Sequence, residues 1–333
     1  MQNVSQEPME HPLEQIIAPV DSDMDKVNAF ISNELRSDIV LINTISNYII
    51  SNGGKRLRPV TLLLAAGACG NTTAHHIPLA AIIEFIHTAT LLHDDVVDAS
   101  ELRRGQVTAN DVWGNQASVL VGDFLYSRAF QQMVKINEMR VMDILADTTN
   151  MIAEGEVLQL MNSHNAGITE NDYYETIKRK TAILFQAACQ LGAVISNVSE
   201  ETEQALADYG LNMGIAFQLI DDVLDYSGDA GKTGKNIGDD LNEGKTTLPL
   251  IRAMKKLPQA QKQIIIDVIE NDTRPTQVNR VIEIVNATDA MDYSKQHALN
   301  YTQKATQALS GLTDSKFKKS MLGLSEFFIS RVY

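Results

Sequence analysis

The sequence lacks the features that mark secreted, membrane-spanning or disulfide-stabilised proteins. Its 333 residues include only two cysteines, Cys69 and Cys189, which lie far apart in apolar surroundings. We therefore expect buried free thiols rather than a disulfide. No run reaches the roughly 18 apolar residues of a membrane-spanning helix, and no basic segment followed by an apolar stretch begins the chain. These absences predict a cytoplasmic protein without stable membrane insertion.

Positive charge and strand-forming patterns are also scarce. The chain carries 28 Lys and Arg against 42 Asp and Glu, a net charge of −14, so no basic surface is available to neutralise a nucleic-acid backbone. No alternation of Val, Ile, Thr or Tyr marks strands, and no Gly-x-Gly-x-x-Gly motif follows a strand-like segment. The abundant Leu, Ile, Ala and Met favour helices. We predict an all-α fold that does not bind nucleic acid.

The chain offers no linker that would divide its helical part. Residues 1–22 are polar, include three prolines and are expected to form a flexible lead-in. From Asp23 one helical pattern continues to Ile49 and stops at Gly53-Gly54. Helical patterns then follow one another to the end, so we predict a single all-helical domain over residues 23–333.

Acidic residues at the end of a long apolar helix give the first candidate site. The run from Ile77 to Leu92 predicts a buried helix, and Asp94, Asp95 and Asp98 follow it directly. Asp94 and Asp98 lie one turn apart on the same face, with Asp95 beside them. Two carboxylates about 6 Å apart at an effective dielectric near 20 repel by roughly 3 kcal/mol. This clustering predicts a bound cation.

A second Asp-Asp-x-x-Asp motif ends another apolar run. It comprises Asp221, Asp222 and Asp225 and follows Phe217-Gln218. Neither motif has a cysteine nearby, and oxygen ligands of this kind are preferred by Mg²⁺. Because Mg²⁺ usually combines one or two carboxylates with substrate phosphates, two such motifs predict a diphosphate held between them. A solvated acidic helix face explains one such motif easily, but two of them poorly.

Basic residues at a predicted helix start indicate a phosphate site. The segment from Lys55 to Pro59 follows Gly53-Gly54 and includes Arg58. Cations in a first turn oppose the helix dipole, whereas the free N–H groups there bind anions. His87 lies two turns before Asp94, on nearly the same helix face. We expect Lys55, Arg58 and His87 to face the same ligand as the acidic motifs.

Two further segments supply cations. The predicted helix from Glu170 to Ile195 contains Lys180 and Thr181 beside an apolar run, which makes Lys180 a candidate for a buried anion contact. The glycine-rich stretch from Ser227 to Asp240 predicts a mobile loop that could close over phosphates. Its nearby cations are Lys232, Lys235 and Lys245, of which Lys235 is the favoured contact; all three could instead serve only solubility.

Together these motifs resemble the trans-isoprenyl diphosphate synthases. The resemblance rests on both aspartate motifs, Gly53-Gly54-Lys55-Arg56-x-Arg58-Pro59, Arg103-Arg104-Gly105, Lys180-Thr181, Phe217-Gln218 and Gly234-Lys235-Asn236-x-Gly238-Asp239-Asp240. It covers the chain from about residue 24 to its end. Residues 84–99, 153–162 and 239–249 are similar to the family's bacterial members that make octaprenyl (C40) diphosphate for respiratory quinones. The resemblance implies a fold with one helical bundle around a central cavity, and a protein that normally forms a homodimer.

The resemblance also implies roles for individual residues. Isopentenyl diphosphate would be held by Lys55, Arg58, His87 and Arg104, and the allylic diphosphate by Arg103, Lys180, Thr181, Gln218 and Lys235. Two or three Mg²⁺ ions would be held by Asp94, Asp98, Asp221, Asp222 and Asp225. The residues expected to act in catalysis are the six aspartates, Asp95 included, together with Lys180.

Product length should depend on the residues below the first motif. Ala89 and Thr90 are small where the family's short-chain members resemble each other in having aromatics, so we expect an open tunnel and elongation past farnesyl. Met133 or Phe130 on the neighbouring helix is the expected deeper stop. The expected reaction joins isopentenyl diphosphate head-to-tail and in trans to farnesyl diphosphate, giving a C40 product; C45 or geranylgeranyl products remain open.

Three other functions are compatible with parts of the pattern. A terpene cyclase would also carry one aspartate motif, but the second motif and the Lys55-x-x-Arg58 pair disfavour it. A non-catalytic subunit of a heteromeric synthase would be expected to have lost acidic residues, yet all are present. A membrane-recruited assembly protein would need a basic or amphipathic face, which the net charge does not supply.

Overall fold

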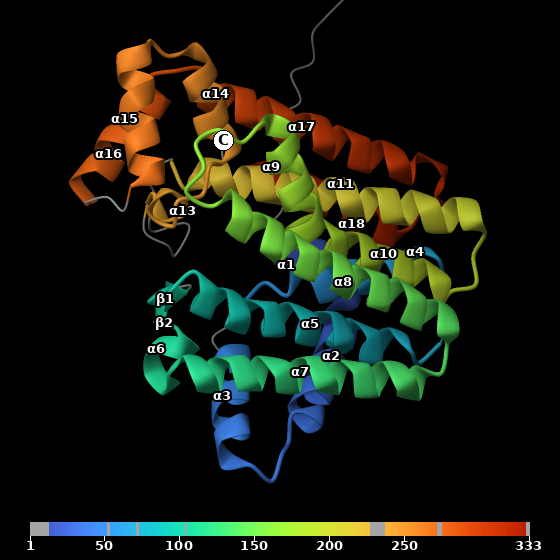
Figure 1. Cartoon of the computed structure of the whole chain (residues 1–333). Coiled ribbons are helices and arrows are strands. Elements are labelled where there is room, and N and C mark those ends of the chain that lie inside the picture. The colour runs from blue at the N-terminus through green and yellow to red at the C-terminus, as the bar shows by residue number, and fades with distance from the viewer. Residues whose placement is uncertain are drawn as a thin grey trace, which may run out of the picture.

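The computed structural model describes residues 13–51, 54–70, 73–103, 105–226, 237–271 and 275–330. Helices make up nearly all of this part of the chain (Figure 1). The exception is a pair of two-residue antiparallel strands, β1 (Leu102–Arg103) and β2 (Gln106–Val107). The predicted all-α fold is confirmed.

The N-terminal segment differs from its prediction. Helix begins at Leu13, with α1 (Leu13–Ile17), the 3-10 turn η1 (Ala18–Val20) and α2 (Asp21–Glu34) in direct succession. Ile16 and Val20 are buried in the main core. The expected flexible lead-in over residues 1–22 is therefore wrong from Leu13 onward, because apolar side chains anchor this segment.

The helix predicted from Asp23 to Ile49 is two helices. α2 ends at Glu34, and α3 (Val40–Ser51) begins after five intervening residues. The side chain of Asn43 closes the turn: its Oδ1 accepts from the Ser37 backbone N–H at 3.0 Å, and its Nδ2 donates to the Ser37 carbonyl at 2.7 Å. The apolar pattern continues across this break, so periodicity alone did not reveal it.

Two long helices carry the first acidic motif and its support. The motif ends α5 (His76–Val97), whose buried face extends from Leu79 to Leu92. α5 packs against α7 (Asn115–Ile136), and the two run side by side in Figure 1. The neighbouring elements are α4 (Leu57–Ala68), α6 (Ala109–Trp113) and α8 (Met139–Asn162).

The helix predicted over Glu170–Ile195 is interrupted at its candidate site. α9 (Glu170–Ile177) leads into a π-helical turn, η2 (Lys178–Ala182), and then into α10 (Ile183–Val194). Glycines let η2 pack closely: a Cβ at Gly155 of α8 would lie 2.6 Å from the Lys180 nitrogen, and one at Gly214 would lie 2.5 Å from the Ala182 Cα. π-helical turns occur frequently at functional sites, and this one bears Lys180 and Thr181.

The remaining helices complete the framework. The second acidic motif lies at the end of α11 (Glu200–Leu224), which packs along α10 and α17. Separate buried clusters lie between α9, α11 and α17 and among α14 to α16. Where residues are described, no helix has the length and apolarity needed to cross a membrane. The other C-terminal elements are α13 (Asp239–Asn242), α14 (Leu248–Lys256), α15 (Gln259–Glu270), α16 (Pro275–Asn286), α17 (Ala290–Ala308), η3 (Leu309–Gly311) and α18 (Lys316–Ser330).

Candidate active site

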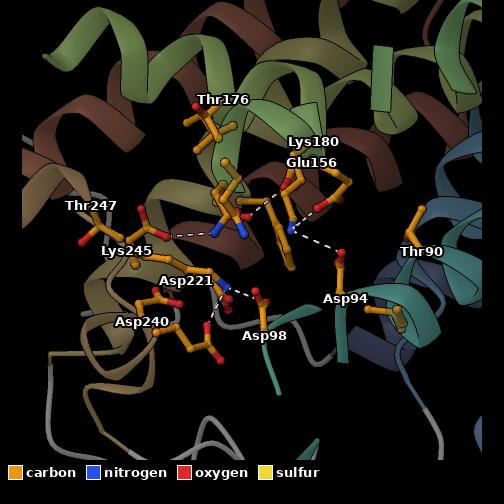
Figure 2. Close-up of a pocket in the computed structure, with 18 of the residues that line it drawn as sticks. Thr90, Asp94, Asp98, Glu156, Thr176, Lys180, Asp221, Asp240, Lys245 and Thr247 are labelled. Carbon is orange, nitrogen blue, oxygen red and sulfur yellow. Dashed lines mark hydrogen bonds and ion pairs between the residues drawn. The ribbon is translucent and has the colours of Figure 1, made fainter. Parts of the chain in front are cut away.

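Both acidic motifs open onto one cavity of about 640 Å³. α5 supplies one wall, α8 and η2 supply the next, and α11 with the segment from Asp239 to Thr247 closes the opposite side (Figure 2). Side chains that the sequence separates by more than a hundred residues therefore face the same space. The predicted residues that line it are Lys55, Arg58, His87, Thr90, Asp94, Asp98, Arg103, Lys180, Thr181, Gln218, Asp221 and Asp222.

The two cavity-facing aspartates of the first motif contact lysines. Lys245 Nζ donates to Asp98 Oδ2 at 2.7 Å and to Glu243 Oε2 at 2.5 Å. Lys180 Nζ lies 3.4 Å from Asp94 Oδ1. Figure 2 shows the two ammonium groups pointing into the space between the acidic helices. The repulsion expected between these carboxylates is thus offset by cations of the chain itself.

Asp95 faces away from the cavity. It is fully buried, and its Oδ1 accepts from Arg103 Nε at 2.6 Å and pairs with Arg103 Nη2 at 2.6 Å. Burial raises the pKa of Asp95, and the Arg103 guanidinium opposes that shift. One residue beyond Asp94, the helix turns the Asp95 side chain by about 100°, so Asp95 contacts Arg103 and does not line the cavity. Its predicted catalytic role stays a prediction.

The second motif presents Asp221 and Asp222 to the cavity. Asp222 is 2% exposed; it accepts from Gln218 Nε2 at 2.8 Å through Oδ1 and from the Tyr173 hydroxyl at 2.5 Å through Oδ2. Burial, with the charge of nearby Asp240, raises the pKa of Asp222 to about 8. Asp225 is not among the residues that line the cavity, although it lies at the boundary of the described chain, where its carbonyl accepts from the Gly238 N–H at 3.0 Å.

The donor set suits Mg²⁺ bound together with phosphate. Eight aspartates and glutamates line the cavity: Asp94, Asp98, Glu156, Asp221, Asp222, Asp239, Asp240 and Glu243. Among the described residues, no three His, Cys, Asp or Glu side chains lie close enough to hold one metal ion by themselves. This arrangement fits a cation that takes one or two carboxylates and completes its shell with water and substrate phosphate.

The predicted phosphate-binding residues line the opposite edge of the cavity. Arg58 Nη1 and His87 Nε2 lie 3.1 Å apart, which joins the start of α4 to the middle of α5. The Arg58 guanidinium lies 4.5 Å from the ring centroid of Phe185, and Lys55 Nζ lies 4.8 Å from that of Phe327. The aromatic faces hold both cations near the cavity. The helix begins at Leu57 rather than at Lys55, because Arg56 adopts a left-handed conformation with φ 44°.

Two residues of the site were underestimated from the sequence. Glu156 was not predicted as a site residue, yet it accepts from Lys180 Nζ at 2.6 Å, and burial near Asp94 raises its pKa to about 7. Lys245 was only one of three candidate loop cations, but it contacts Asp98. The sequence did carry a signal for Glu156, because it directly follows Gly155. The absence of a side chain at Gly155 lets η2 pack closely against α8.

Two of the predicted diphosphate contacts lie outside the described residues. They are Arg104, next to Arg103, and Lys235 in the glycine-rich segment; Lys232 also falls in that segment. Their predicted roles stay predictions.

The residues expected to control product length are distributed differently. Thr90 lines the cavity one turn below Asp94, but Ala89 and Met133 are fully buried elsewhere, and Phe130 is 40% exposed on α7. Ala89 is five residues before Asp94, which rotates it out of the helix face that Thr90 and Asp94 share. None of the three residues Ala89, Met133 and Phe130 lines this cavity, and their predicted roles in setting product length stay predictions. Ile152 and Leu184 line it instead, each one turn from Glu156 and Lys180 respectively.

Known proteins resemble this chain over nearly its whole length. Residues 39–287 match the Polyprenyl synthetase family. The chain is 48% identical over 319 residues to octaprenyl diphosphate synthase of Escherichia coli, covering 96% of this chain and 99% of that protein. It is 44% identical to the geranyl-diphosphate-specific all-trans-nonaprenyl-diphosphate synthase of Rhodobacter capsulatus, covering 95% and 97%.

Solved structures of related enzymes have the same fold as this chain. A polyprenyl synthase from Caulobacter crescentus, complexed with calcium and isoprenyl diphosphate, superimposes with a TM-score of 0.93 at 43% identity, covering 96% of this chain and 97% of that one. A decaprenyl diphosphate synthase from Rhodobacter capsulatus superimposes with a TM-score of 0.91 at 41% identity, covering 97% of this chain and 100% of that one. A cavity with two facing aspartate motifs, a matched family and these related folds lead to one conclusion: the chain belongs to the polyprenyl synthetase family of prenyl-transferring enzymes.

Proposed function

We propose that this protein joins isopentenyl diphosphate head-to-tail and in trans to an allylic diphosphate, preferably farnesyl diphosphate, and repeats the step to a C40 product. One observation carries the proposal: two Asp-Asp-x-x-Asp motifs from different helices face each other across one cavity, beside Lys180 and Lys245. A site that collects both charges in this way suits a diphosphate and its cations. The relatives that make octaprenyl and nonaprenyl diphosphates support this substrate class.

The basic edge of the cavity is proposed to bind isopentenyl diphosphate. Lys55, Arg58 and His87 line it together, and Arg58 and His87 contact each other. Arg104 completes this group in the proposal. Arg103 is kept in place by Asp95 and faces the same cavity, so it can contact a diphosphate without becoming mobile.

The acidic side is proposed to bind the allylic diphosphate with two or three Mg²⁺ ions. Asp94, Asp98, Asp221, Asp222 and Asp225 would hold the ions, and Lys180, Thr181, Gln218 and Lys235 would contact the phosphates. Mg²⁺ would supply stabilisation of the negative charge that develops on the leaving diphosphate. When a diphosphate arrives, we expect Lys180 and Lys245 to exchange a carboxylate oxygen for a phosphate oxygen.

The chemistry needs charge stabilisation and dryness rather than a nucleophilic side chain. Breaking the allylic C–O bond gives diphosphate and a delocalised carbocation, which the isopentenyl double bond attacks; a proton then leaves, and the released diphosphate can accept it. Lys180 and Arg103 are fixed cations beside the leaving group, and such preorganised charges lower the barrier most where water is excluded. Ile152, Leu184 and Phe217 line the cavity and are proposed to keep water from the cation.

Product length is proposed to depend on the layer below the charged groups. This layer consists of Thr90, Ile152 and Leu184, which all line the cavity. They lie one helical turn from Asp94, Glu156 and Lys180, respectively. A growing chain has to pass this layer. Replacing Thr90 by Phe should therefore shorten the product, and replacing Ile152 by Ala should lengthen it or leave it unchanged.

A second copy of the chain is the proposed protein partner. Leu120, Phe130 and Val134 lie on one side of α7 and are 66%, 40% and 66% exposed. Exposed apolar side chains repeated along one helix face are typical of an interface. We propose a homodimer formed through α7, to be tested by sedimentation of the protein and of a Leu120→Glu, Val134→Glu variant.

The experiment that tests the function is product analysis of the purified chain alone with farnesyl diphosphate, isopentenyl diphosphate and Mg²⁺. A dominant C40 product that EDTA abolishes supports the proposal in full. A C45 or geranylgeranyl product keeps the reaction and changes only its length; the nonaprenyl relative makes C45 the first alternative. If turnover requires another protein, the chain is a subunit of a heteromeric synthase.

A further inference from the structure

Asp222 is oriented by two neutral donors from different parts of the fold. Its Oδ1 accepts from Gln218, one turn earlier on α11, and its Oδ2 accepts from the Tyr173 hydroxyl on α9. The carboxylate is 2% exposed and Tyr173 is 4% exposed. Two bonds, one to each oxygen, fix the plane of the carboxylate, and Asp222 is among the residues that line the cavity.

The same hydrogen bonds extend to the π-helical turn. Gln218 Oε1 accepts from Thr181 Oγ1 at 3.0 Å, so Thr181, Gln218, Asp222 and Tyr173 form one continuous chain. Tyr173 and Thr181 lie on either side of Lys178, where α9 passes into η2. Tyr173 therefore connects the second acidic motif to the turn that carries Lys180.

Tyr173 is itself firmly placed. Its ring packs in the buried cluster that includes Ile177 and Leu219. α9 starts with a capping box in which the Thr169 side chain accepts from the Asp172 N–H and Asp172 accepts from the Thr169 N–H at 2.9 Å. A fixed helix start and a buried ring hold the hydroxyl in position against Asp222.

We propose that Tyr173 is a positioning residue of the active site, which holds the Asp222 carboxylate in the orientation that binds the metal–diphosphate group. This inference rests on the proposed function of the second motif. Groups that orient a metal-binding side chain typically change metal affinity or activity by about 10- to 100-fold when they are removed. Tyr173 itself contacts neither the substrate nor the reacting atoms in this role.

The adjacent tyrosine provides a matched control. Tyr174 lies on the same helix, but its hydroxyl contacts His297 Nδ1 of α17 at 2.6 Å and not the acidic motif. The rings of Tyr173 and Tyr174 contact each other edge to face at 5.4 Å between centroids. Tyr173→Phe and Tyr174→Phe thus each remove one buried or half-buried hydroxyl from one helix while keeping the ring.

The experiment compares these two variants with the wild-type full chain. We expect Tyr173→Phe to weaken calorimetric binding of inorganic diphosphate in the presence of Mg²⁺ by about 10-fold or more, and to raise by a similar factor the Mg²⁺ concentration needed for half-maximal rate. The KM for isopentenyl diphosphate should stay within about twofold, and Tyr174→Phe should change these values by less than about twofold.

A double variant separates positioning from a general loss of structure. If Tyr173 acts through Asp222, Tyr173→Phe should have little further effect on diphosphate binding in an Asp222→Asn background. Equal losses in the two tyrosine variants, full additivity with Asp222→Asn, or unchanged Mg²⁺ and diphosphate affinity in Tyr173→Phe would each overturn the inference. An inactive wild-type chain would overturn the proposed function instead, while diphosphate binding would still test Tyr173.

Discussion

The two aspartate motifs have the same sequence spacing but different surroundings. In the first motif, Asp94 and Asp98 contact the ammonium groups of Lys180 and Lys245. In the second, Asp222 is enclosed and accepts from an amide and a phenol. Lysines at the first motif can exchange a carboxylate for a phosphate, whereas the donors around Asp222 have no charge to give to a substrate. The comparison indicates a responsive side and a preset side of one cavity.

The largest expected effect is the loss of activity when an aspartate of either motif is replaced, and it should be similar for the two motifs. Asp98→Asn and Asp221→Asn should each lower the rate of condensation by about 10²–10³-fold or more, because each removes a carboxylate proposed to hold the Mg²⁺ that stabilises the separating diphosphate. The measurement is incorporation of labelled isopentenyl diphosphate at saturating substrates, and EDTA should have an equally large effect. Asp314→Asn, at a 98% exposed site, is the control. A motif that tolerates its substitution would break the comparison.

The next effect should fall on the lysines of the first motif. Lys180→Gln and Lys245→Gln should raise the KM for the allylic diphosphate by about 10-fold or more, as expected for the loss of a charged hydrogen bond to phosphate, with little change in the KM for isopentenyl diphosphate. Steady-state kinetics with each substrate varied in turn measures both. Lys26→Gln, at a 61% exposed site, should behave as wild type. Equal changes in both KM values would argue against lysine exchange at the allylic side.

The enclosure of Asp222 should make the free energy of unfolding depend on pH. The native pKa of Asp222 is about 8 against an ordinary value of 3.8, so the folded protein keeps a proton that the unfolded chain loses. The free energy of unfolding of wild type should therefore fall as pH rises from about 4 to 8, by at most about 1.4 kcal/mol per pH unit. Asp222→Asn should be more stable at pH 8, with a smaller difference near pH 4.

Urea unfolding without divalent cations or diphosphate measures this trend. It would be contradicted by Asp222→Asn being less stable than wild type at pH 8. Together with the expected loss of activity, a gain in stability would identify Asp222 as a residue whose burial weakens the fold in favour of function.

The smallest effect concerns the backbone that carries Lys245. Gly244 has a φ of +71°, its carbonyl accepts from the His164 N–H at 2.9 Å, and a Cβ there would lie 2.4 Å from the His164 ring. Gly244→Ala should reduce the free energy of unfolding by about 1–2 kcal/mol and weaken allylic binding. Gly311→Ala, which meets open space at negative φ, is the matched control for urea unfolding. Equal stability of the two variants would show that this loop can adapt.

Most of the site could be predicted because its residues follow local rules. Asp94 and Asp98 share a face with Thr90 and His87 by helical spacing, and all four line the cavity. The same rule, applied to Asp95 and Ala89, would have turned both away from the cavity. The structure agrees with this helical phase, since neither residue lines the cavity, and the predicted roles of both stay predictions.

Other features depended on contacts between distant segments. Glu156 became a site residue because Gly155 lets η2 approach α8, and Lys245 because the loop after α13 lies against Asp98. In the sequence Tyr173 is only an aromatic residue of a predicted helix. Its contact with Asp222 exists because α9 packs beside α11. No spacing within one segment encodes such pairings.

The sequence by itself determined the helical class, the two carboxylate motifs and the basic segment, because helix periodicity and ligand chemistry are local properties of the chain. The family followed from the resemblance of these motifs to known members. The tertiary structure alone decided which carboxylates meet lysines, which one is enclosed by neutral donors, and which apolar residues lie one turn below them. Those outcomes depend on how closely helices pack, and that is set by small residues such as Gly155 and Gly214 acting on partners far away in the chain.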